Sequence, residues 1–379
     1  MAKKIVIIGA GVSGLTSAML LSRDKDYSIT VVAKHMPGDL DAMYASPIAG
    51  ANYLPMSDRE NSQYEARTLP ELQRLASHVP EAGIHHQRAR LYRREADMPT
   101  LRQGSNGFNG MFLENPWYQE VVNNFVELEV TPEMTAAGIA GGCEFDSVCI
   151  NTPVYLSWLV GKCRANGVVF KRGSVKSLAD ARRWWSSSEK AFAEAKEKGE
   201  EGPADIVLNM TGLGALKLGG VMDQAMVPMR GQVVVVRNVA PVMFGTSGTD
   251  DDDEELTYGM TRAVGGGTVL GGTYQRGNWD SQPDAATALR IMQRSIDTVP
   301  ELLNGTGKKD ITGLEIIRHA VGFRPYREGG VRIEKEKMPD GSWVVHNYGH
   351  SGWGYQGSYG CAEKVVALVK EVSRDKAKL

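Results

Sequence analysis

The first thirty residues carry the clearest hydrophobic pattern in the chain. Residues 4–8 form a short, β-branched apolar run with little alternation, which is typical of a strand covered on both faces of a sheet. Residues 13–22 then follow a helical pattern, and residues 27–32 predict a second strand. A strand, a helix and a strand in this order make a βαβ unit, so the sequence predicts that a parallel-sheet domain opens the chain.

Segments of the same kind recur in the middle and at the end of the chain. Between the first and second groups, residues 55–144 hold short polar helices and few runs typical of parallel strands. The expected helices lie at 70–77, 152–166, 179–198 and 361–372, the buried strands at 167–171, 205–209 and 342–346, and the antiparallel strands at 232–237, 256–261 and 268–274. The heavily charged helix at 179–198 is expected to present a solvated face.

This order predicts an α/β protein in which two domains alternate along the chain. A discontinuous, Rossmann-like nucleotide-binding domain is expected from residues 1–54, 145–225 and 312–379. The second domain, from residues 55–144 and 226–311, is expected to be α+β with a largely antiparallel sheet.

Composition narrows the class of partner. The chain has 379 residues, 42% of them hydrophobic and 23% charged, so it can bury a large core. Its formal net charge of −2 argues against nucleic acid as a partner. The longest apolar runs fall far short of the roughly 20 residues needed to span a bilayer, and no secretory cleavage site follows the first strand. We expect a small-molecule partner and no membrane association.

Neither the cysteines nor the most acidic segment predicts a metal site. The four cysteines, Cys143, Cys149, Cys163 and Cys361, lack CxxC spacing and suitably placed histidines, so we expect buried thiols in a reducing compartment. The acidic run at 250–255 lacks the spacing of a calcium loop. We expect this run to be solvated and mobile, with metal binding as the minor alternative.

A glycine-rich turn joins the first strand to the first helix. It fits the GxGxxG pattern, in which glycines allow a tight turn, close approach of a pyrophosphate and close packing of helix on strand. The N-terminus of the following helix offers backbone N–H groups to phosphates. The predicted dinucleotide contacts are therefore Gly9, Ala10, Gly11, Val12, Ser13 and Gly14.

The acidic residue that usually binds the adenosine ribose, about 20 residues after the turn, is missing. The second strand instead runs into Lys34 and His35, and Asp39 and Asp41 come a few residues late. The ribose contact therefore stays open, and this motif alone also leaves NADP open.

A second glycine cluster lies near the C-terminus, in residues 344–362, and leads into the last expected helix. Its glycines create another place where backbone can approach a ligand closely. A nicotinamide enzyme does not need such a place. A flavin does, because backbone donors must hold its ring where charge develops on reduction.

This cluster resembles the characteristic pattern of the D-amino-acid oxidase family, which also contains D-aspartate oxidases. Further motifs resemble that family in the same order over essentially the whole chain, and the first of them is similar to a flavin-contacting loop of fungal members. These motifs are residues 44–52, 229–232, 270–279 and 322–327. The resemblance implies that the Rossmann-like domain binds FAD and that the other domain binds the substrate.

The resemblance also implies roles for individual residues. Arg324 would clamp the substrate carboxylate, which agrees with the bidentate match of guanidinium to carboxylate, and Tyr258 would hydrogen-bond the same group. The Gly352 carbonyl would accept from the substrate amine, with Gln356 and Asn52 nearby. The implied FAD contacts, beyond the first turn, are Lys34, His35, Ala45, Ser46, Gly50, Asn52, Val175, Gly212, Ser351, Gly352, Gly354, Tyr355 and Gln356.

The implied reaction is direct hydride transfer from the substrate Cα to flavin N5. Positioning would then carry the catalysis, and no acid–base residue is expected. Molecular oxygen is the second substrate, and the products are a 2-oxo acid, ammonia and hydrogen peroxide. The family resemblance leaves a homodimer open.

Two alternatives stay open. Aspartate-specific members of the family often carry Arg where this chain has Tyr274, which favours neutral or apolar D-amino acids, but Arg230, Arg262 and Arg276 keep a D-aspartate oxidase possible. The second alternative is a non-catalytic NAD(P)-binding Rossmann protein.

The last three residues, Ala377-Lys378-Leu379, are a conservative variant of the Ser-Lys-Leu address that a peroxisomal import receptor reads at a free C-terminus. An enzyme that makes hydrogen peroxide would give this address a purpose. We therefore expect a peroxisomal location.

Overall fold

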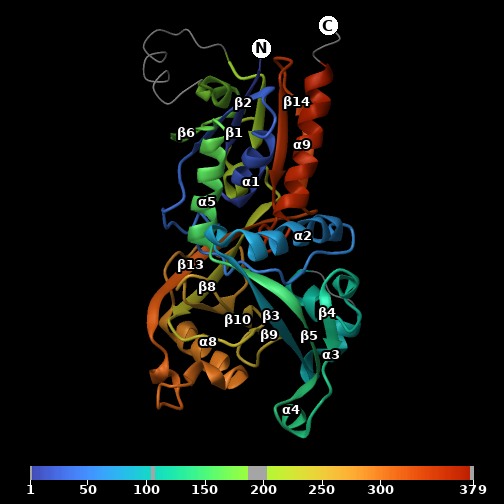
Figure 1. Ribbon diagram of the computed structural model, residues 1–379, viewed down its shortest axis with the longest axis vertical. Helices are drawn as coiled ribbons and strands as arrows, with labels where there is room; N and C mark the ends of the chain where they lie inside the picture. The colour runs from blue at the N-terminus through green and yellow to red at the C-terminus, as the bar shows by residue number, and fades with distance from the viewer. Residues whose placement is uncertain (1, 104–106, 187–202, 376–379) are drawn as a thin grey trace. The chain divides into compact units, whose positions relative to one another are not determined.

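The chain folds into two units, and successive segments of the sequence belong to one unit and then to the other (Figure 1). The structure is a computed structural model that describes residues 2–103, 107–186 and 203–375. The first unit comprises Met1–Pro47, Leu156–Val227 and Pro325–Leu379, and the second comprises Ile48–Tyr155 and Pro228–Arg324. The predicted alternation of two discontinuous domains therefore matches the structure.

The domain boundaries differ from the predicted ones, because residues 48–54, 145–155 and 312–324 lie in the second unit. Backbone hydrogen bonds explain the first two segments: the Tyr53 N–H donates to the Val148 carbonyl (3.0 Å), and the Ile150 N–H donates to the Ala51 carbonyl (2.9 Å). The third segment contains most of a strand that pairs within the second sheet. These pairings depend on partners remote in sequence, which hydrophobic patterns do not specify.

The first unit is built on a sheet with strand order β14-β15-β7-β1-β2-β6 in the described part of the chain. All neighbouring strands are parallel except β14 and β15. The strands are β1 (Lys3–Ile8), β2 (Tyr27–Ala33), β6 (Val169–Arg172), β7 (Ile206–Asn209), β14 (Arg332–Lys337) and β15 (Trp343–Tyr348). The apolar residues of β1 are buried, as expected for a strand covered on both faces.

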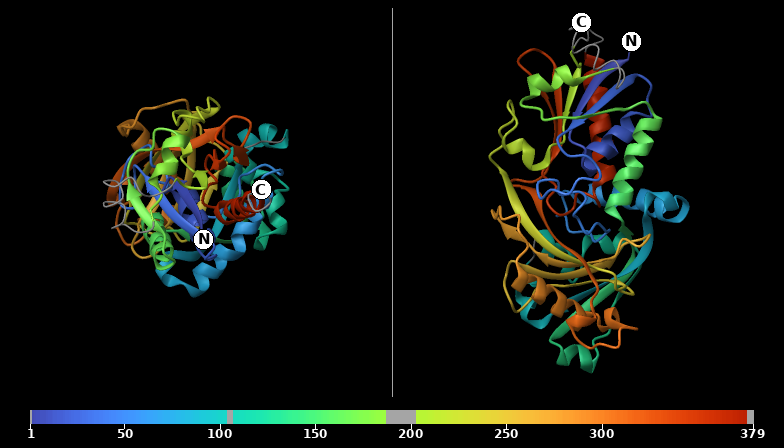
Figure 2. Two further views of the ribbon diagram at one scale, coloured as in Figure 1. Left: turned by 90° about the horizontal axis from the view of Figure 1, so that it is seen from above. Right: turned by 90° about the vertical axis from the view of Figure 1, so that its left-hand side faces the viewer.

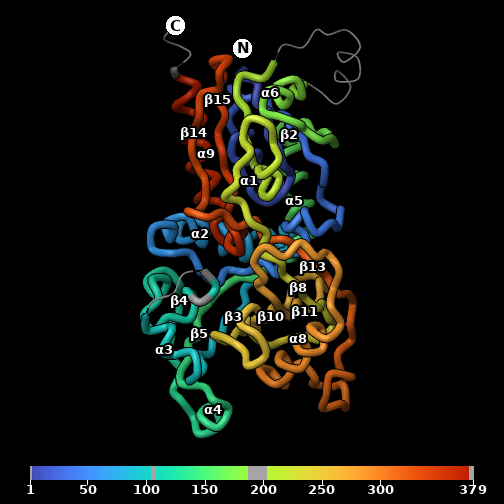
Figure 3. The backbone as a smooth tube through the Cα atoms, turned by 180° about the vertical axis from the view of Figure 1, so that it is seen from behind, coloured from blue at the N-terminus to red at the C-terminus, as the bar shows by residue number. Residues whose placement is uncertain are grey.

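Helices cover one face of this sheet. Helix α1 (Val12–Leu21) packs against α9 (Ser358–Asp375), and α9 lies beside β14 and β15 (Figures 1 and 3). The part of α5 (Thr152–Ala165) that belongs to this unit lies beside α1, since the Cys163 thiol is 3.6 Å from the Leu15 carbonyl oxygen. The predicted strands and helices at 4–8, 13–22, 27–32 and 361–372 are thus present.

The predicted long helix at 179–198 was wrong over its described part. Helix α6 covers only Leu178–Ala181 and is followed by a 3₁₀ turn, η5, at Arg182–Trp184. The chain then turns toward β2: the Trp185 indole donates to the Ser28 carbonyl (3.1 Å), and the Ser186 N–H donates to the Thr30 hydroxyl (3.1 Å). Trp185 is buried in the core below β1 and β7, so tertiary packing ends the helix early. Residues 187–198 lie outside the described residues.

The second unit contains a nine-stranded, largely antiparallel sheet within the described residues. Its order is β12-β8-β11-β10-β9-β3-β5-β4, with β13 also paired to β8, and only β3 and β9 run parallel. The strands are β3 (Ile84–Arg94), β4 (Asn123–Glu127), β5 (Ile139–Ile150), β8 (Met226–Val236), β9 (Met243–Thr246), β10 (Glu255–Thr261), β11 (Thr268–Thr273), β12 (Gln275–Arg276) and β13 (Ile316–Arg327). The predicted antiparallel sheet is therefore confirmed.

Helix α8 (Ala285–Thr298) lies across one face of this sheet (Figure 2, right). Its Ile291 and Met292 pack with Val234 and Leu270 of the sheet in one apolar cluster. The other helices of this unit are α2 (Ser62–His78), α3 (Met98–Arg102) and α4 (Pro132–Ala136), and short 3₁₀ turns begin at Pro80, Glu95, Gly107, Trp117, Pro300 and Ile311. Helix α2 begins eight residues before the predicted position at Pro70, which lies inside it.

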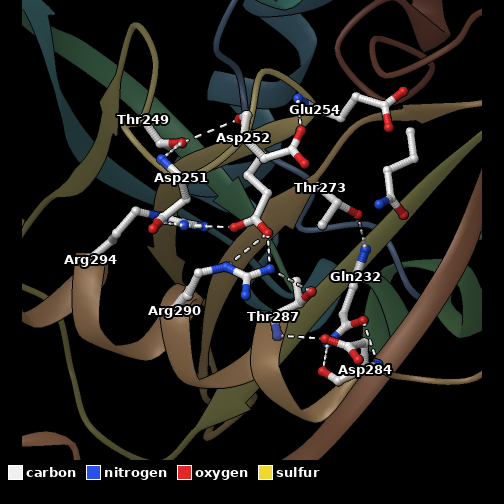
Figure 4. A network of polar contacts seen from close by, with 12 residues as sticks. Gln232, Thr249, Asp251, Asp252, Glu254, Thr273, Asp284, Thr287, Arg290 and Arg294 are labelled. Carbon is white, nitrogen blue, oxygen red and sulfur yellow. Dashed lines mark hydrogen bonds and ion pairs between the residues drawn. The ribbon is translucent and has the colours of Figure 1, made fainter.

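The acidic run at 250–255 is exposed from Asp250 to Glu254, as expected for a solvated segment, but three of its six carboxylates pair with arginines, which the sequence did not predict. Asp250 pairs with Arg94, and Asp251 pairs with Arg294 of α8. Glu255 is only 4% exposed. Figure 4 shows Arg290 and Arg294 reaching from α8 toward this run. A count of like charges could not reveal these partners, because they lie 35 to 156 residues away in sequence.

The structure can be compared with the predictions about cysteines, metals and membranes over the described residues only. Cys143, Cys149, Cys163 and Cys361 are all buried and free. Among the described residues, no group of three or more acidic, histidine or cysteine side chains could hold a metal ion. None of the described helices is both long and apolar enough to cross a membrane.

Candidate cofactor and substrate sites

The turn between β1 and α1 leaves no room for side chains at two of its glycines. Gly9 has a φ of +115°, and a Cβ at this position would lie 2.3 Å from the Met210 carbonyl oxygen. A Cβ at Gly14 would lie 2.0 Å from the Gly9 carbonyl oxygen. The motif therefore does here what its spacing predicts: it brings β7, β1 and the start of α1 close together.

The start of α1 is suited to a phosphate. No acidic residue lies in its first turn, which contains Ser13, and its N-cap is Gly11. The N–H groups and the positive end of the helix dipole can therefore face an anion. The Ser46 hydroxyl lies at this turn and accepts a hydrogen bond from the Val12 N–H (3.1 Å), while the Tyr44 hydroxyl donates to the Ala10 carbonyl (2.6 Å). The predicted Ala45 and Ser46 segment thus meets the glycine turn.

The segment after β2, where a ribose-binding acid was missing, is held by an arginine of β6. Arg172 pairs with Asp39 and donates to the Lys34 carbonyl oxygen (3.2 Å). This hydrogen-bonded partner lowers the pKa of Asp39 to about 2. His35 stacks on Tyr44 with 6.0 Å between ring centroids. Lys34 and His35 are therefore held near the predicted turn, but Asp39 is already committed to Arg172.

The C-terminal glycine cluster lies against the same turn. A Cβ at Gly354 would be 4.0 Å from Val12 Cγ1, and the Tyr355 hydroxyl donates to the Ser46 carbonyl (2.8 Å). Gln356 follows and is buried, whereas Gly352 is exposed. Residues predicted from opposite ends of the sequence are thus brought together within the first unit.

Two further predicted contacts, Gly212 and Ser351, both lie beside Pro325. The Ser351 N–H donates to the Pro325 carbonyl (2.9 Å), and a Cβ at Gly212 would lie 3.5 Å from the Pro325 ring. Val175 lies apart from this group, where it packs against the core cluster that contains Trp185. A side-chain role for Val175 is therefore core packing, and a cofactor contact would come from its backbone.

The two histidines of this cluster are buried and structural. Burial lowers the pKa of His350 to about 4, and its Nε2 lies 2.9 Å from the Asn347 amide oxygen. Burial, together with the nearby Arg332, also lowers the pKa of His346 to about 4. Both rings are therefore neutral near pH 7.

In the second unit, Arg324 and Tyr258 are brought together as predicted. Arg324 Nη2 donates to the Tyr258 hydroxyl (3.2 Å), and Nη1 donates to the Thr273 carbonyl (2.9 Å). Its guanidinium lies 5.0 Å from the centre of the Tyr274 ring. None of the ion pairs in the described part of the chain involves Arg324. A partly buried cation without a carboxylate partner is a good receptor for a carboxylate ligand.

Glycines make the space that these two side chains occupy. A Cβ at Gly231 would lie 2.4 Å from Arg324 Nη1, and one at Gly271 would lie 2.1 Å from the Tyr258 ring. Sequence reasoning did not assign Gly231 or Thr273 to the site, although both lie within motifs that resembled the family. It also missed Phe108, whose ring lies 6.1 Å from that of Tyr258.

Gly50 and Asn52 belong to the second unit, whereas the other predicted FAD contacts belong to the first. A Cβ at Gly50 would lie 2.6 Å from the Met260 sulfur, so this loop packs closely on β10. Asn52 forms a bridge with Cys149 of β5, and its side-chain amide lies 4.0 Å from the Met260 sulfur. Their predicted ligand contacts remain predictions.

The arginines that kept an aspartate-specific enzyme open differ in their surroundings. Arg230 is 3% exposed and donates to the carbonyls of Asp280 (2.7 Å) and Gln282 (2.6 Å) and to the side chains of Gln232 and Gln275. Arg262 is also buried and donates to the Ala49 carbonyl (2.6 Å). Arg230 is thus occupied by neutral oxygen acceptors within the protein.

Comparison with known proteins agrees with these sites. A family model described as FAD dependent oxidoreductase matches residues 4–368. The chain is 52% identical to a D-amino-acid oxidase of Fusarium vanettenii over 99% of its own length and 98% of the relative's. It is 32% identical to a D-aspartate oxidase of Cryptococcus neoformans, over 98% of each chain. The solved structure of a glycine oxidase from Bacillus cereus superposes with a TM-score of 0.71 at 15% identity, covering 97% of this chain and 95% of that one, so it supports the fold alone.

The glycines that crowd the first turn, the uncapped start of α1 and the C-terminal cluster packed against it suit a dinucleotide with a flavin. The match of the family model over nearly the whole chain points the same way. The chain belongs to the family of FAD-dependent oxidoreductases.

Proposed function

We propose that the chain is an FAD-dependent D-amino-acid oxidase. The observation that carries this function is Arg324, a partly buried guanidinium held by Tyr258 and Thr273 with no carboxylate partner among the described residues. A substrate carboxylate would supply the missing negative charge. The high identity to the D-amino-acid oxidase of Fusarium vanettenii supports the same activity.

The residues of the first unit fit FAD. Gly9, Gly11 and Gly14 leave room at the turn, the N–H groups at the start of α1 would hold the pyrophosphate, and the cluster at 351–356 would hold the flavin end. When bound, FAD would supply the two-electron oxidation of the substrate and the later reduction of oxygen.

The residues of the chain bind and orient the substrate. Arg324 neutralises the carboxylate and fixes its plane, while Tyr258 adds a hydroxyl to the same group. Burial lowers the pKa values of His346 and His350 to about 4, so these histidines are weak bases, and no base is needed if the Cα–H bond breaks by hydride loss from a neutral amine. The overall reaction converts a D-amino acid, oxygen and water to a 2-oxo acid, ammonia and hydrogen peroxide.

We also propose a preference for neutral or apolar side chains. Arg230 already donates to four oxygen acceptors, so using it for a second carboxylate would break existing hydrogen bonds. Tyr274 adds no charge beside Arg324. Comparing kcat/KM for D-alanine and D-aspartate tests this preference, and equal values would contradict it.

Anaerobic titration tests the activity itself. The purified protein should be yellow, and D-alanine should bleach its flavin absorption in the absence of oxygen, whereas L-alanine should not. Air should restore the colour and release one hydrogen peroxide per D-alanine consumed. A colourless protein, or a yellow one that D-amino acids never bleach, would return the assignment to a non-catalytic dinucleotide-binding protein.

A peroxisomal location and a homodimer are further parts of the proposal. The location is supported by Ala377-Lys378-Leu379, which lie outside the described residues. A fluorescent protein fused before residue 1 should enter peroxisomes and should stay outside them when residues 377–379 are deleted. Light scattering on the purified holoenzyme tests the homodimer, and a mass of one chain would contradict it.

A further inference from the structure

A ring of polar contacts in the second unit leads from the acidic run to Arg324. The Thr273 carbonyl, which accepts from Arg324, belongs to the residue that pairs with Glu255 across β10 and β11. The next residue, Tyr274, donates its N–H to the Glu254 carbonyl (2.6 Å). The backbone that supports Arg324 is therefore fixed by the last two residues of the acidic run.

The carboxylate of Glu255 fixes this end of the run to α8. Arg290 Nε donates to Glu255 at 3.0 Å, and Arg294 Nη1 donates to it at 2.6 Å. The Glu255 side chain is only 3% exposed, so these two arginines, rather than water, stabilise its negative charge. The arginines are four residues apart, and they therefore lie on one face of the helix.

A second set of contacts connects Arg290 to Thr273 through the start of α8 (Figure 4). Arg290 also donates to the Thr287 hydroxyl (3.1 Å), and Asp284 caps the helix by accepting from the Thr287 N–H (2.6 Å). Gln232 joins the Asp284 backbone through its amide and donates its own N–H to the Thr273 hydroxyl (2.9 Å). Both routes from Glu255 thus end at Thr273.

We propose that Glu255 is a positioning residue for the substrate carboxylate: held by Arg290 and Arg294, it fixes Thr273 and through it the guanidinium of Arg324. This inference rests on the proposed function of Arg324. Glu255 is buried beside α8, and its carboxylate pairs with Arg290 and Arg294 rather than with Arg324. A purely structural ion pair between β10 and α8 would instead affect stability and leave carboxylate binding unchanged.

The test is Glu255→Gln, which keeps the shape but removes the charge that holds the two arginines. Two control variants accompany it. Ile291→Val loosens the apolar packing of α8 without touching the polar ring, and Asp250→Asn removes an acidic side chain that is 94% exposed and pairs with Arg94. Each holoenzyme is measured for FAD content, Tm, D-alanine kinetics and the Kd of propionate, a carboxylate without an amine.

Glu255→Gln should raise KM for D-alanine and the propionate Kd by about fivefold, the size expected for coupled neighbours. FAD content should stay unchanged, and both control variants should keep the original KM and Kd. If Glu255→Gln lowers Tm as Ile291→Val does but leaves KM and Kd alone, the ion pair is only structural and the proposal is overturned.

A double-mutant cycle separates this inference from the proposed function. The effect of Glu255→Gln on kcat/KM should largely disappear in an Arg324→Ala background, because the residue it positions is gone. Equal effects in both backgrounds would overturn the inference while leaving the oxidase assignment intact. An unaltered protein that does not oxidise any D-amino acid would instead defeat the proposed function itself.

Discussion

Replacing Arg324 with Ala tests the centre of the proposed function. Two of the five N–H donors of this guanidinium bond to Tyr258 and Thr273 in the described part of the chain. One N–H therefore remains on each of Nη1 and Nη2, enough for two charge-assisted bonds to a carboxylate. Such bonds contribute about 1.5 to 3 kcal/mol each.

Losing both bonds should therefore cost about 3 to 6 kcal/mol of transition-state binding, and water can replace part of it. Since about 1.4 kcal/mol corresponds to a factor of ten, we expect kcat/KM for D-alanine to fall by about 10² to 10³. Oxygen consumption at increasing D-alanine concentrations measures this value even if the variant cannot be saturated. Arg324→Lys should keep the positive charge but lose the paired N–H donors of the guanidinium. Its kcat/KM should therefore lie between those of the original protein and Arg324→Ala.

The matched control is Arg237→Ala. Arg237 lies on the same sheet, and its pair with Glu315 is about three-quarters exposed on both sides and 3.8 Å long, so its loss should change little. FAD content should stay close to the original in both alanine variants, and Tm should fall only in Arg324→Ala, because the Thr273 carbonyl and the Tyr258 hydroxyl lose their donor. A kcat/KM for Arg324→Ala within threefold of the original would refute its role as the carboxylate receptor.

Three further variants test other parts of the structure. Gly9→Ala would place a Cβ 2.3 Å from the Met210 carbonyl oxygen, so the purified protein should lose most of its FAD, measured as flavin released per chain; full flavin content would contradict the predicted turn. Tyr258→Phe removes one hydroxyl from the carboxylate site and should raise KM for D-alanine by up to about tenfold, the value of one hydrogen bond, with Tm as the control. His350→Gln tests the pH dependence of stability. Burial lowers the pKa of His350 to about 4 in the folded state, whereas the unfolded value stays near 6.5. The contribution of His350 to the free energy of unfolding is therefore complete above about pH 6.5 and is lost as the pH falls toward 4, by on the order of 3 kcal/mol. The free energy of unfolding, measured with urea at pH 7.5 and at pH 5, should differ less between the two pH values in His350→Gln than in the original protein. An equal difference in both proteins would refute the lowered pKa of His350.

Local patterns were sufficient to predict the N-terminal strand, helix and strand of the first unit and its C-terminal strand and helix. The strand and helix before and after Gly9 follow from an apolar run, a glycine turn and a helical repeat, all within about 30 residues of sequence. The same holds for the C-terminal strand and helix on either side of the glycine cluster. In such segments, the burial of one face determines the structure, and the residues that bury it are neighbours in the chain.

The early end of helix α6 shows where this reasoning fails. Charged residues with good helix propensity continue past Ala181, yet Trp185 turns into the core and donates to Ser28, which lies 157 residues earlier. Propensity is worth tenths of a kcal/mol per residue, whereas burying a tryptophan is worth several times more. A remote packing site therefore decides the end of the helix.

The arginine partners of the acidic run were missed for a related reason. Six adjacent carboxylates predict mutual repulsion and solvation if no partner is known. Three of them, Asp250, Asp251 and Glu255, pair with arginines of β3 and α8, which the topology of the second unit brings next to the loop. Glu255 lies at the start of β10, and its strand partner is Thr273, the residue that supports Arg324. The carboxylate of Glu255 is thereby connected to the proposed substrate site. The sequence could point to Arg324 through its motif, but what holds Arg324 in place depends on which strands become neighbours.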